Sequence, residues 1–344
     1  MSPYQCLPTH AFWRTAVAER SSETLDGLWA PAFEIDRKDA IVTAGSCFAQ
    51  HIGRALVARG MNWLDAEPAP AELNDEARKA GQYGVFSFRT GNLYTPAMLL
   101  QWLQWALGQC SQSRETWQHD GRFFDPFRPA VDTRGFASEQ ALFASREQTL
   151  AAIRLAVRRA KVLVFTLGLT EAWQHRETGV FYPVCPGTVR GEFDPNLHAF
   201  RNLGFNDTCQ AMTAAINLMR TLNPGLRVLL TVSPVPLTAT ATGEHVLSAT
   251  TYSKSVLRAV AGQLCQDLPE VDYFPSYEII TAPTFAGAFY QPNQREITPE
   301  GVAFVMRHFF AGLDGQTAAP LANSTPSLAT EDLVCEDAKL DYYA

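Results

Sequence analysis

Residues 161–168 read Lys-Val-Leu-Val-Phe-Thr-Leu-Gly, a continuous apolar run that ends on a glycine. Such a run is typical of a parallel strand covered by helices on both faces, because a half-exposed strand would alternate apolar and polar residues. A helical pattern over 146–160 leads directly into it. The run therefore predicts an inner strand of a parallel sheet, entered from a helix.

Similar runs alternate with helical patterns along the rest of the chain. Further strands are expected near 39–45, 227–234 and 271–274. Besides 146–160, helices are expected at 47–57, 206–222, 250–268 and 298–313. This alternation predicts an α/β fold, a three-layer α/β/α sandwich with a mostly parallel central sheet. Ligands bind at the carboxyl ends of the strands in such sheets, so functional residues are expected after each predicted strand.

The length of 344 residues suits one large domain with additions. We assign residues 35–312 to a single α/β domain, residues 1–34 to an N-terminal arm and residues 313–344 to a polar tail. Two stretches of the domain, about 66–145 and 174–204, leave the strand–helix cycle and are expected to be irregular insertions. Long irregular segments of a compact domain are often binding loops.

Composition excludes several classes of function. Lys and Arg number 28 against 35 Asp and Glu, and the resulting net charge of −7 argues against a nucleic-acid partner. No apolar run approaches the ~18 residues of a membrane span. The first twenty residues show no signal-peptide pattern, so we expect a cytoplasmic protein with free thiols. The seven cysteines form no CxxC pair, and neither GxxxxGK[ST] nor GxGxxG occurs, so neither a metal nor a cofactor is expected.

The strand predicted at 39–45 turns directly into a helix through Gly45-Ser46-Cys47-Phe48-Ala49. Two potential nucleophiles, Ser46 and Cys47, therefore stand at a helix N-terminus. Unpaired N–H groups and a positive partial charge at this position favour a thiolate and a developing oxyanion alike. In the alternative interpretation, Ser46 only caps the helix and Cys47 is only a small buried residue.

The string GSCFA at 45–49 resembles the signature of the GSCFA-domain family, which is similar to a branch of the SGNH/GDSL hydrolase superfamily. Other stretches also look like blocks of this family, and the resemblance covers about residues 35–312. These stretches are 87–95, 166–173, 231–234 and 274–278. The resemblance implies the same three-layer fold. It also implies an esterase, acyltransferase or lipase activity, in many such enzymes on acylated carbohydrates.

The first superfamily block, Gly-Asp-Ser, aligns with Gly45, Ser46 and Cys47. The resemblance thus implies that Cys47 is the nucleophile, with Ser46 as its rival. The second block contributes an oxyanion donor, for which Gly91 is the best candidate, and Asn92 could donate through its side chain. The alternative for this pair is a plain Gly-Asn turn.

The third block corresponds to Gly168-Leu169-Thr170-Glu171. Here Thr170 replaces the oxyanion-binding asparagine of the superfamily, and a hydroxyl can donate one hydrogen bond with a shorter reach. Glu171 could orient a histidine or bind a substrate hydroxyl. Trp173 follows in an aromatic-rich stretch that suits a sugar or ordinary packing.

The general base is harder to assign, because the Asp-x-x-His block of the superfamily is absent. Residues 293–296 at that place read Asn-Gln-Arg-Glu. The best alternative base is His245, which lies in the loop after the strand at 227–234, and Glu296 could itself be the base if its pKa were raised. His51 lies one helical turn after Cys47, either as its partner or as a polar residue on the exposed helix face.

From the sequence we expect an acyl-ester hydrolase or acyltransferase. Its substrate would be an acyl group carried by a carbohydrate or another small hydroxylated molecule. The alternative is a non-catalytic module that binds a carbohydrate or polyol and that kept the fold but lost the Asp-x-x-His block.

Overall fold

The structure is a computed structural model that describes residues 2–315 and 333–343. Within these residues the central sheet has four strands, all parallel, in the order β1–β4–β8–β9. The strands are β1 (Ile41–Gly45), β4 (Val162–Leu167), β8 (Arg227–Val232) and β9 (Val271–Tyr273). They coincide with the four apolar runs of the sequence, so the predicted parallel sheet is confirmed.

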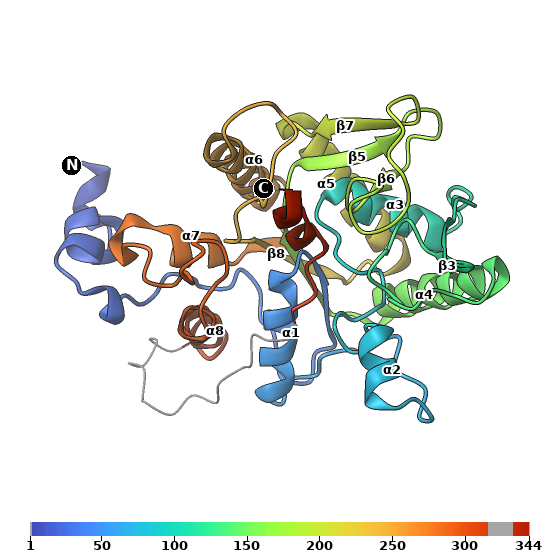
Figure 1. The fold of residues 1–344 in the computed structure, drawn as a ribbon. Helices are drawn as coiled ribbons and strands as arrows, with labels where there is room; N and C mark the ends of the chain where they lie inside the picture. The colour runs from blue at the N-terminus through green and yellow to red at the C-terminus, as the bar shows by residue number, and fades with distance from the viewer. Residues whose placement is uncertain (1, 316–332, 344) are drawn as a thin grey trace.

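Helices cover both faces of this sheet, as a three-layer sandwich requires (Figure 1). The helices of the described residues are α1 (Phe48–Ala58), α2 (Asp75–Ala80), α3 (Pro96–Ala106), α4 (Glu139–Arg159), α5 (Phe205–Leu222), α6 (Val246–Asp267), α7 (Ser276–Thr281) and α8 (Pro299–Leu313), and all but α2 contribute buried residues to a core. Leu163 and Phe165 of β4 face a core that includes α3, α4, α5 and α6, whereas Val162 and Val164 face a core that includes α1, α7 and α8. Successive side chains of a strand point to opposite faces, so a strand in the middle layer must be apolar throughout.

The chain changes direction across the sheet at β1. After α1, Trp63 forms a parallel bridge with Ile41 on the free edge of β1. The chain then crosses to the opposite face and returns through α3 and α4 into β4. The carboxyl ends of β1 and β4 therefore form a topological switch point, which is where open α/β sheets bind their ligands.

The stretch at 66–145 contains α2, α3, a hairpin of β2 (Trp117–His119) and β3 (Arg122–Phe124), and the start of α4. Helix α3 begins with Thr95 as N-cap and Pro96 at the first position. It shows no clear helical period because it is buried between α4 and α5 and is apolar on most sides. The hairpin region is fixed by Asp125, which forms buried ion pairs with Arg128 and Arg146, both at 2.8 Å.

The stretch at 174–204 belongs to a small antiparallel sheet in the order β6–β5–β7. Its strands are β5 (Glu171–His175), β6 (Phe181–Tyr182) and β7 (His198–Asn202). Strand β5 follows β4 after a few residues, so this second sheet stands directly over the carboxyl end of the central sheet (Figure 1).

Short helical turns form the two ends of the chain. The N-terminal arm holds η1 (Pro3–Cys6), η2 (Thr9–Ala11), η3 (Arg14–Ala18) and η4 (Ser22–Thr24). A further short turn, η5 (Pro283–Phe285), lies within the domain after α7. Of the expected polar tail, 316–332 and 344 lie outside the described residues. Residues 333–343, here called the C-terminal segment, include η7 (Glu336–Tyr343) and dock above the start of α1 (Figure 1). In the described part of the chain, no helix is long and apolar enough to cross a membrane.

Candidate active site

The turn after β1 is held tightly against the end of β4. Gly45 has a φ of +126°, and a Cβ at this position would lie 2.4 Å from the carbonyl oxygen of Thr166. The same oxygen accepts a hydrogen bond from the Ser46 N–H at 3.0 Å. A Cβ on Gly168 would lie 2.8 Å from the Cβ of Ser46. Two glycines therefore let the strand ends meet closely, and the buried Ser46 hydroxyl has no hydrogen-bond partner among the described residues.

Cys47 follows as the N-cap residue of α1, and its side chain makes no capping hydrogen bond. Only 6% of Cys47 is exposed. Its thiol interacts with the thiol of Cys335, and Sγ of Cys335 donates to Oδ1 of Asp337 at 2.6 Å. The neighbouring Cys47 thiol and burial raise the pKa of Cys335, so Cys335 stays protonated. The candidate nucleophile thus faces a thiol from the C-terminal segment.

Two side-chain amides converge on one carbonyl beside this thiol pair. Nε2 of Gln50 donates to the carbonyl oxygen of Val334 at 2.8 Å, and Nδ2 of Asn92 donates to the same oxygen at 2.9 Å. Oε1 of Gln50 also accepts from the Val334 N–H at 3.1 Å. Gln50 lies one helical turn after Cys47, on the same side of α1. Two donors on a carbonyl oxygen next to a nucleophile form the arrangement that stabilises the oxyanion in acyl transfer.

A buried lysine completes the group. Nζ of Lys254, on α6, donates to the carbonyl oxygen of Gly168 at 2.7 Å. Burial lowers the pKa of Lys254 to about 7, against the opposing charges of Cys47 and Asp337. At neutral pH a large share of Lys254 is therefore an uncharged amine. An amine with a pKa near the working pH can accept and return a proton.

Charged groups of the C-terminal segment meet partners at the same place. Asp337 forms an ion pair with Arg295 at 2.8 Å. Glu336 accepts from the amide of Asn92 and from the hydroxyl of Tyr94, the latter at 3.1 Å. Burial raises the pKa of Glu336, and these two hydrogen bonds oppose the rise. The segment is thus bound through polar contacts to the walls of the site.

The structure brings together several of the residues singled out in the sequence. The Leu93 N–H donates to the Gly45 carbonyl at 2.8 Å, which places Gly91 and Asn92 beside the turn that holds Cys47. Thr170 points elsewhere, because its hydroxyl donates to Oδ1 of Asn202 on β7 at 2.7 Å.

The sequence candidates for the base lie apart from the turn. His245 is exposed, and its Nδ1 accepts from the Leu247 N–H at 3.2 Å, so that it caps α6. Glu296 is also exposed. His51 is buried against Phe48, contrary to the expectation of an exposed polar residue. Burial, followed by the charge of Arg54, lowers the pKa of His51 to about 4. In residues 2–315 and 333–343, no hydrogen bond joins any of these three side chains to Ser46 or Cys47.

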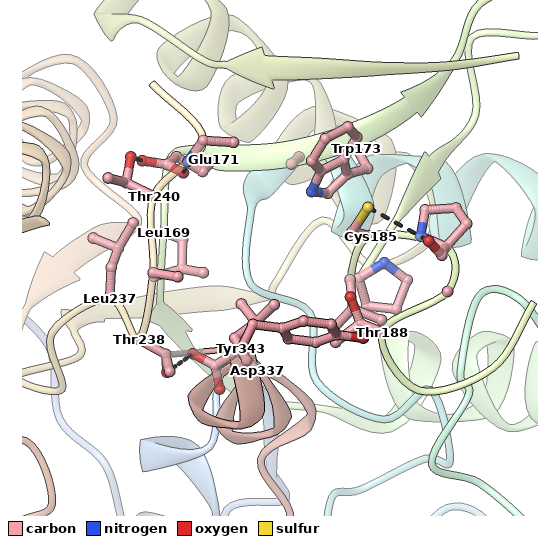
Figure 2. Close-up of a pocket in the computed structure, with 18 of the residues that line it drawn as sticks. Leu169, Glu171, Trp173, Cys185, Thr188, Leu237, Thr238, Thr240, Asp337 and Tyr343 are labelled. Carbon is pink, nitrogen blue, oxygen red and sulfur yellow. Dashed lines mark hydrogen bonds between the residues drawn. The ribbon is translucent and has the colours of Figure 1, made fainter. Parts of the chain in front are cut away.

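A cavity of about 490 Å³ is lined by Leu169, which follows β4, and by Asp337, the residue that accepts the hydrogen bond of the Cys335 thiol. Figure 2 shows Glu171 and Trp173 of β5 on one side of it, and Asp337 and Tyr343 of the C-terminal segment on the other. Glu171 accepts from the hydroxyl of Thr240 at 2.6 Å. Burial raises the pKa of Glu171, and this hydrogen bond opposes the rise. The cavity offers an aromatic face and a carboxylate, a combination that suits a hydroxylated ligand.

Sequence reasoning did not assign Gln50 or Arg295 to the site, and it expected Lys254 to contact an anion or a carbonyl rather than to act as a base. Lys254 lies on the same buried face of α6 as Leu257 and Ala261. A lysine is rarely buried without a partner, so its place on an apolar helix face indicates a specific role. Gln50 lies three residues after Cys47, and Arg295 lies next to Glu296 in the stretch where the superfamily base was sought. No motif or periodic pattern in the C-terminal segment predicts that it lies at the site.

Comparisons with known proteins identify the family. No curated protein and no solved structure matched the chain. A family model described as the GSCFA family matches residues 40–309, which include the central sheet, the turn after β1 and Lys254. The match covers most of the 344 residues. The chain therefore belongs to the GSCFA family.

Proposed function

We propose that the protein is an acyl-ester hydrolase or acyltransferase with Cys47 as nucleophile. One observation carries this proposal: two amide donors, from Gln50 and Asn92, hold a carbonyl oxygen near Cys47. The buried Lys254 lies close enough to Cys47 for the charge of Cys47 to affect the pKa of the lysine. In this account the Val334 carbonyl stands where the acyl carbonyl of a substrate binds. The activity agrees with the one that the resemblance to SGNH hydrolases implies.

The reaction follows from these groups. Neutral Lys254 takes the proton of Cys47 as the sulfur attacks the acyl carbon, and Gln50 and Asn92 stabilise the oxyanion. The C–O bond of the ester then breaks, and Lys254 returns the proton to the leaving alcohol, so that a thioester remains on Cys47. Water or the hydroxyl group of an acceptor releases the acyl group in the second half of the reaction.

Lys254 suits the role of base better than His245 or Glu296, because it is buried at the site and they are exposed. Its lowered pKa supplies the neutral form that a base needs. Ser46 remains the rival nucleophile, since its hydroxyl is buried next to Gly168 without a partner.

The substrate in this proposal carries its acyl group on a carbohydrate or another small hydroxylated molecule. The cavity of about 490 Å³ supports this class of substrate. Its Trp173 ring can stack on a sugar face, and Glu171, already hydrogen-bonded to Thr240, can accept from a substrate hydroxyl.

The test is the turnover of an activated ester, p-nitrophenyl acetate, by the reduced full-length protein. We expect Cys47→Ala to lose turnover, while Ser46→Ala and His245→Gln keep it. Cys110→Ala, at an exposed cysteine, is the matched control. Loss of turnover in Ser46→Ala alone would make the serine the nucleophile, and loss in His245→Gln would restore the histidine as base. Saccharide binding by a wild-type protein without any ester turnover would favour the non-catalytic module.

A further inference from the structure

The C-terminal segment lines both the proposed substrate cavity and a second cavity. Asp337, Leu340 and Tyr343 line the cavity of about 490 Å³ on one side. Leu333 to Glu336 line a second cavity, of about 540 Å³, on the other side. The segment thus contributes residues to both cavities, and Cys335, which interacts with Cys47, lines the second.

The segment also occupies the groups that a substrate needs. The Val334 carbonyl takes both amide donors, and Cys335 covers the Cys47 thiol, which leaves Cys47 buried. A substrate can reach Cys47 only if this segment moves away. Whatever holds the segment in place therefore controls access to the nucleophile.

We propose that Cys47 and Cys335 form a reversible disulfide that locks the C-terminal segment over the site and turns the enzyme off under oxidising conditions. The inference rests on the proposed role of Cys47 as nucleophile. Its structural basis is the contact of the two thiols, with the Val334 main chain clamped by Gln50 and Asp337 anchored by Arg295 on either side of Cys335. These anchors hold the second thiol against the first.

The chemistry needs an oxidant, for which we name a peroxide. Cys47 gives its proton to Lys254, and the thiolate attacks the O–O bond of hydrogen peroxide to give a sulfenic acid and a hydroxide, which takes the proton from Lys254 and leaves as water. The sulfur of Cys335 then attacks the sulfenic sulfur, a second water leaves, and the S–S bond forms. Asp337, which accepts the hydrogen bond of the Cys335 thiol, is placed to take its proton. A dithiol reverses the oxidation by thiol–disulfide exchange.

The experiment treats reduced full-length protein with hydrogen peroxide, blocks the remaining thiols with iodoacetamide and digests after Lys and Arg. Mass spectrometry should find a cross-link between fragments 39–54 and 308–339, lost on treatment with dithiothreitol. We expect alkylation of Cys47 to fall at least about tenfold, because a disulfide sulfur offers no thiolate. Exposed Cys110 is the internal reference. Cys110→Ser should keep the cross-link, and Cys335→Ser should abolish it.

Peroxide treatment that oxidises Cys47 without joining it to Cys335 would overturn the inference. An equal yield of cross-links from Cys47 to other cysteines in the folded protein would also overturn it. The proposed function is tested separately, by ester turnover of the reduced protein. A reversible Cys47–Cys335 cross-link in a protein without turnover would support the disulfide and overturn the proposed function, so the two failures are distinguishable.

Discussion

Replacing Lys254 by methionine separates a catalytic role from a structural one. Burial lowers the pKa of Lys254 from 10.5 to about 7. That difference corresponds to a folding cost of about 5 kcal/mol for the charged form. Because the pKa of Lys254 is lowered in the folded state, the folded protein does not bear this cost above pH 10.5, where the lysine is neutral in both states. The free energy of unfolding then decreases by about this amount as the pH falls from 10.5 to about 7.

Lys254→Met removes this cost and also removes the hydrogen bond to Gly168, which is worth about 1–3 kcal/mol when the remaining carbonyl stays buried. We therefore expect the variant to be at least as stable as the wild type at pH 7. Its turnover should nevertheless fall by about 10²–10⁴-fold, the usual contribution of a general base.

The assay is kcat/KM for p-nitrophenyl acetate between pH 5 and 9, together with urea unfolding at pH 7. For the wild type, kcat/KM should rise with pH through an inflection near 7, as the amine loses its proton. Lys161→Met, at an exposed lysine, is the matched control and should leave both measurements unchanged. Wild-type turnover with the same inflection in Lys254→Met would refute the assignment of Lys254 as the base.

Three further predictions concern the walls of the site and its support. Asn92→Ala should lower kcat by about 10²–10³-fold with little change in KM, as for a lost oxyanion donor, and an unchanged kcat would remove Asn92 from this role. Gly45→Ala should destabilise the fold by about 3 kcal/mol or more, measured by urea unfolding, because its Cβ would clash with the Thr166 carbonyl. Gly60→Ala, with a φ of +72° and no heavy atom within 4 Å of its Cβ position, isolates the backbone strain and should cost about 1 kcal/mol. Burial raises the pKa of Asp125, but its two arginine partners outweigh burial and hold it at about 2, so about 2 kcal/mol of wild-type stability should disappear between pH 4 and 2. Asp125→Asn should lower the stability at pH 7 by about 3–5 kcal/mol and remove much of this acid dependence, and an unaltered acid transition would contradict the argument.

The parts of the fold that could be predicted are those encoded in local sequence. The strands at 41–45 and 162–167 are fully buried in one layer, so their apolar runs were sufficient to identify them. Helix α3 was missed because it is enclosed by other helices and has no polar face to produce a period. The turn predicted at 45–49, which begins on Gly45, is found at the carboxyl end of β1.

The rest of the site depends on contacts between distant parts of the chain. Lys254, from α6, binds the Gly168 carbonyl, and Arg295, from the loop before α8, binds Asp337. Cys335 reaches Cys47 from the far end of the sequence. The C-terminal segment is short, and it docks through individual hydrogen bonds and an ion pair. Such contacts leave no periodic pattern, so the sequence alone offered no way to place this segment.

The central claim is that Cys47 carries the acyl group during the reaction, and trapping the acyl-enzyme tests it most directly. Reduced full-length protein is mixed with p-nitrophenyl acetate, quenched in acid and digested, and the acetyl group is located within fragment 39–54 by tandem mass spectrometry. The account predicts an acetyl group on Cys47 that neutral hydroxylamine removes, as expected for a thioester. An acetyl group on Ser46, or steady turnover without any acylation of this fragment, would contradict it.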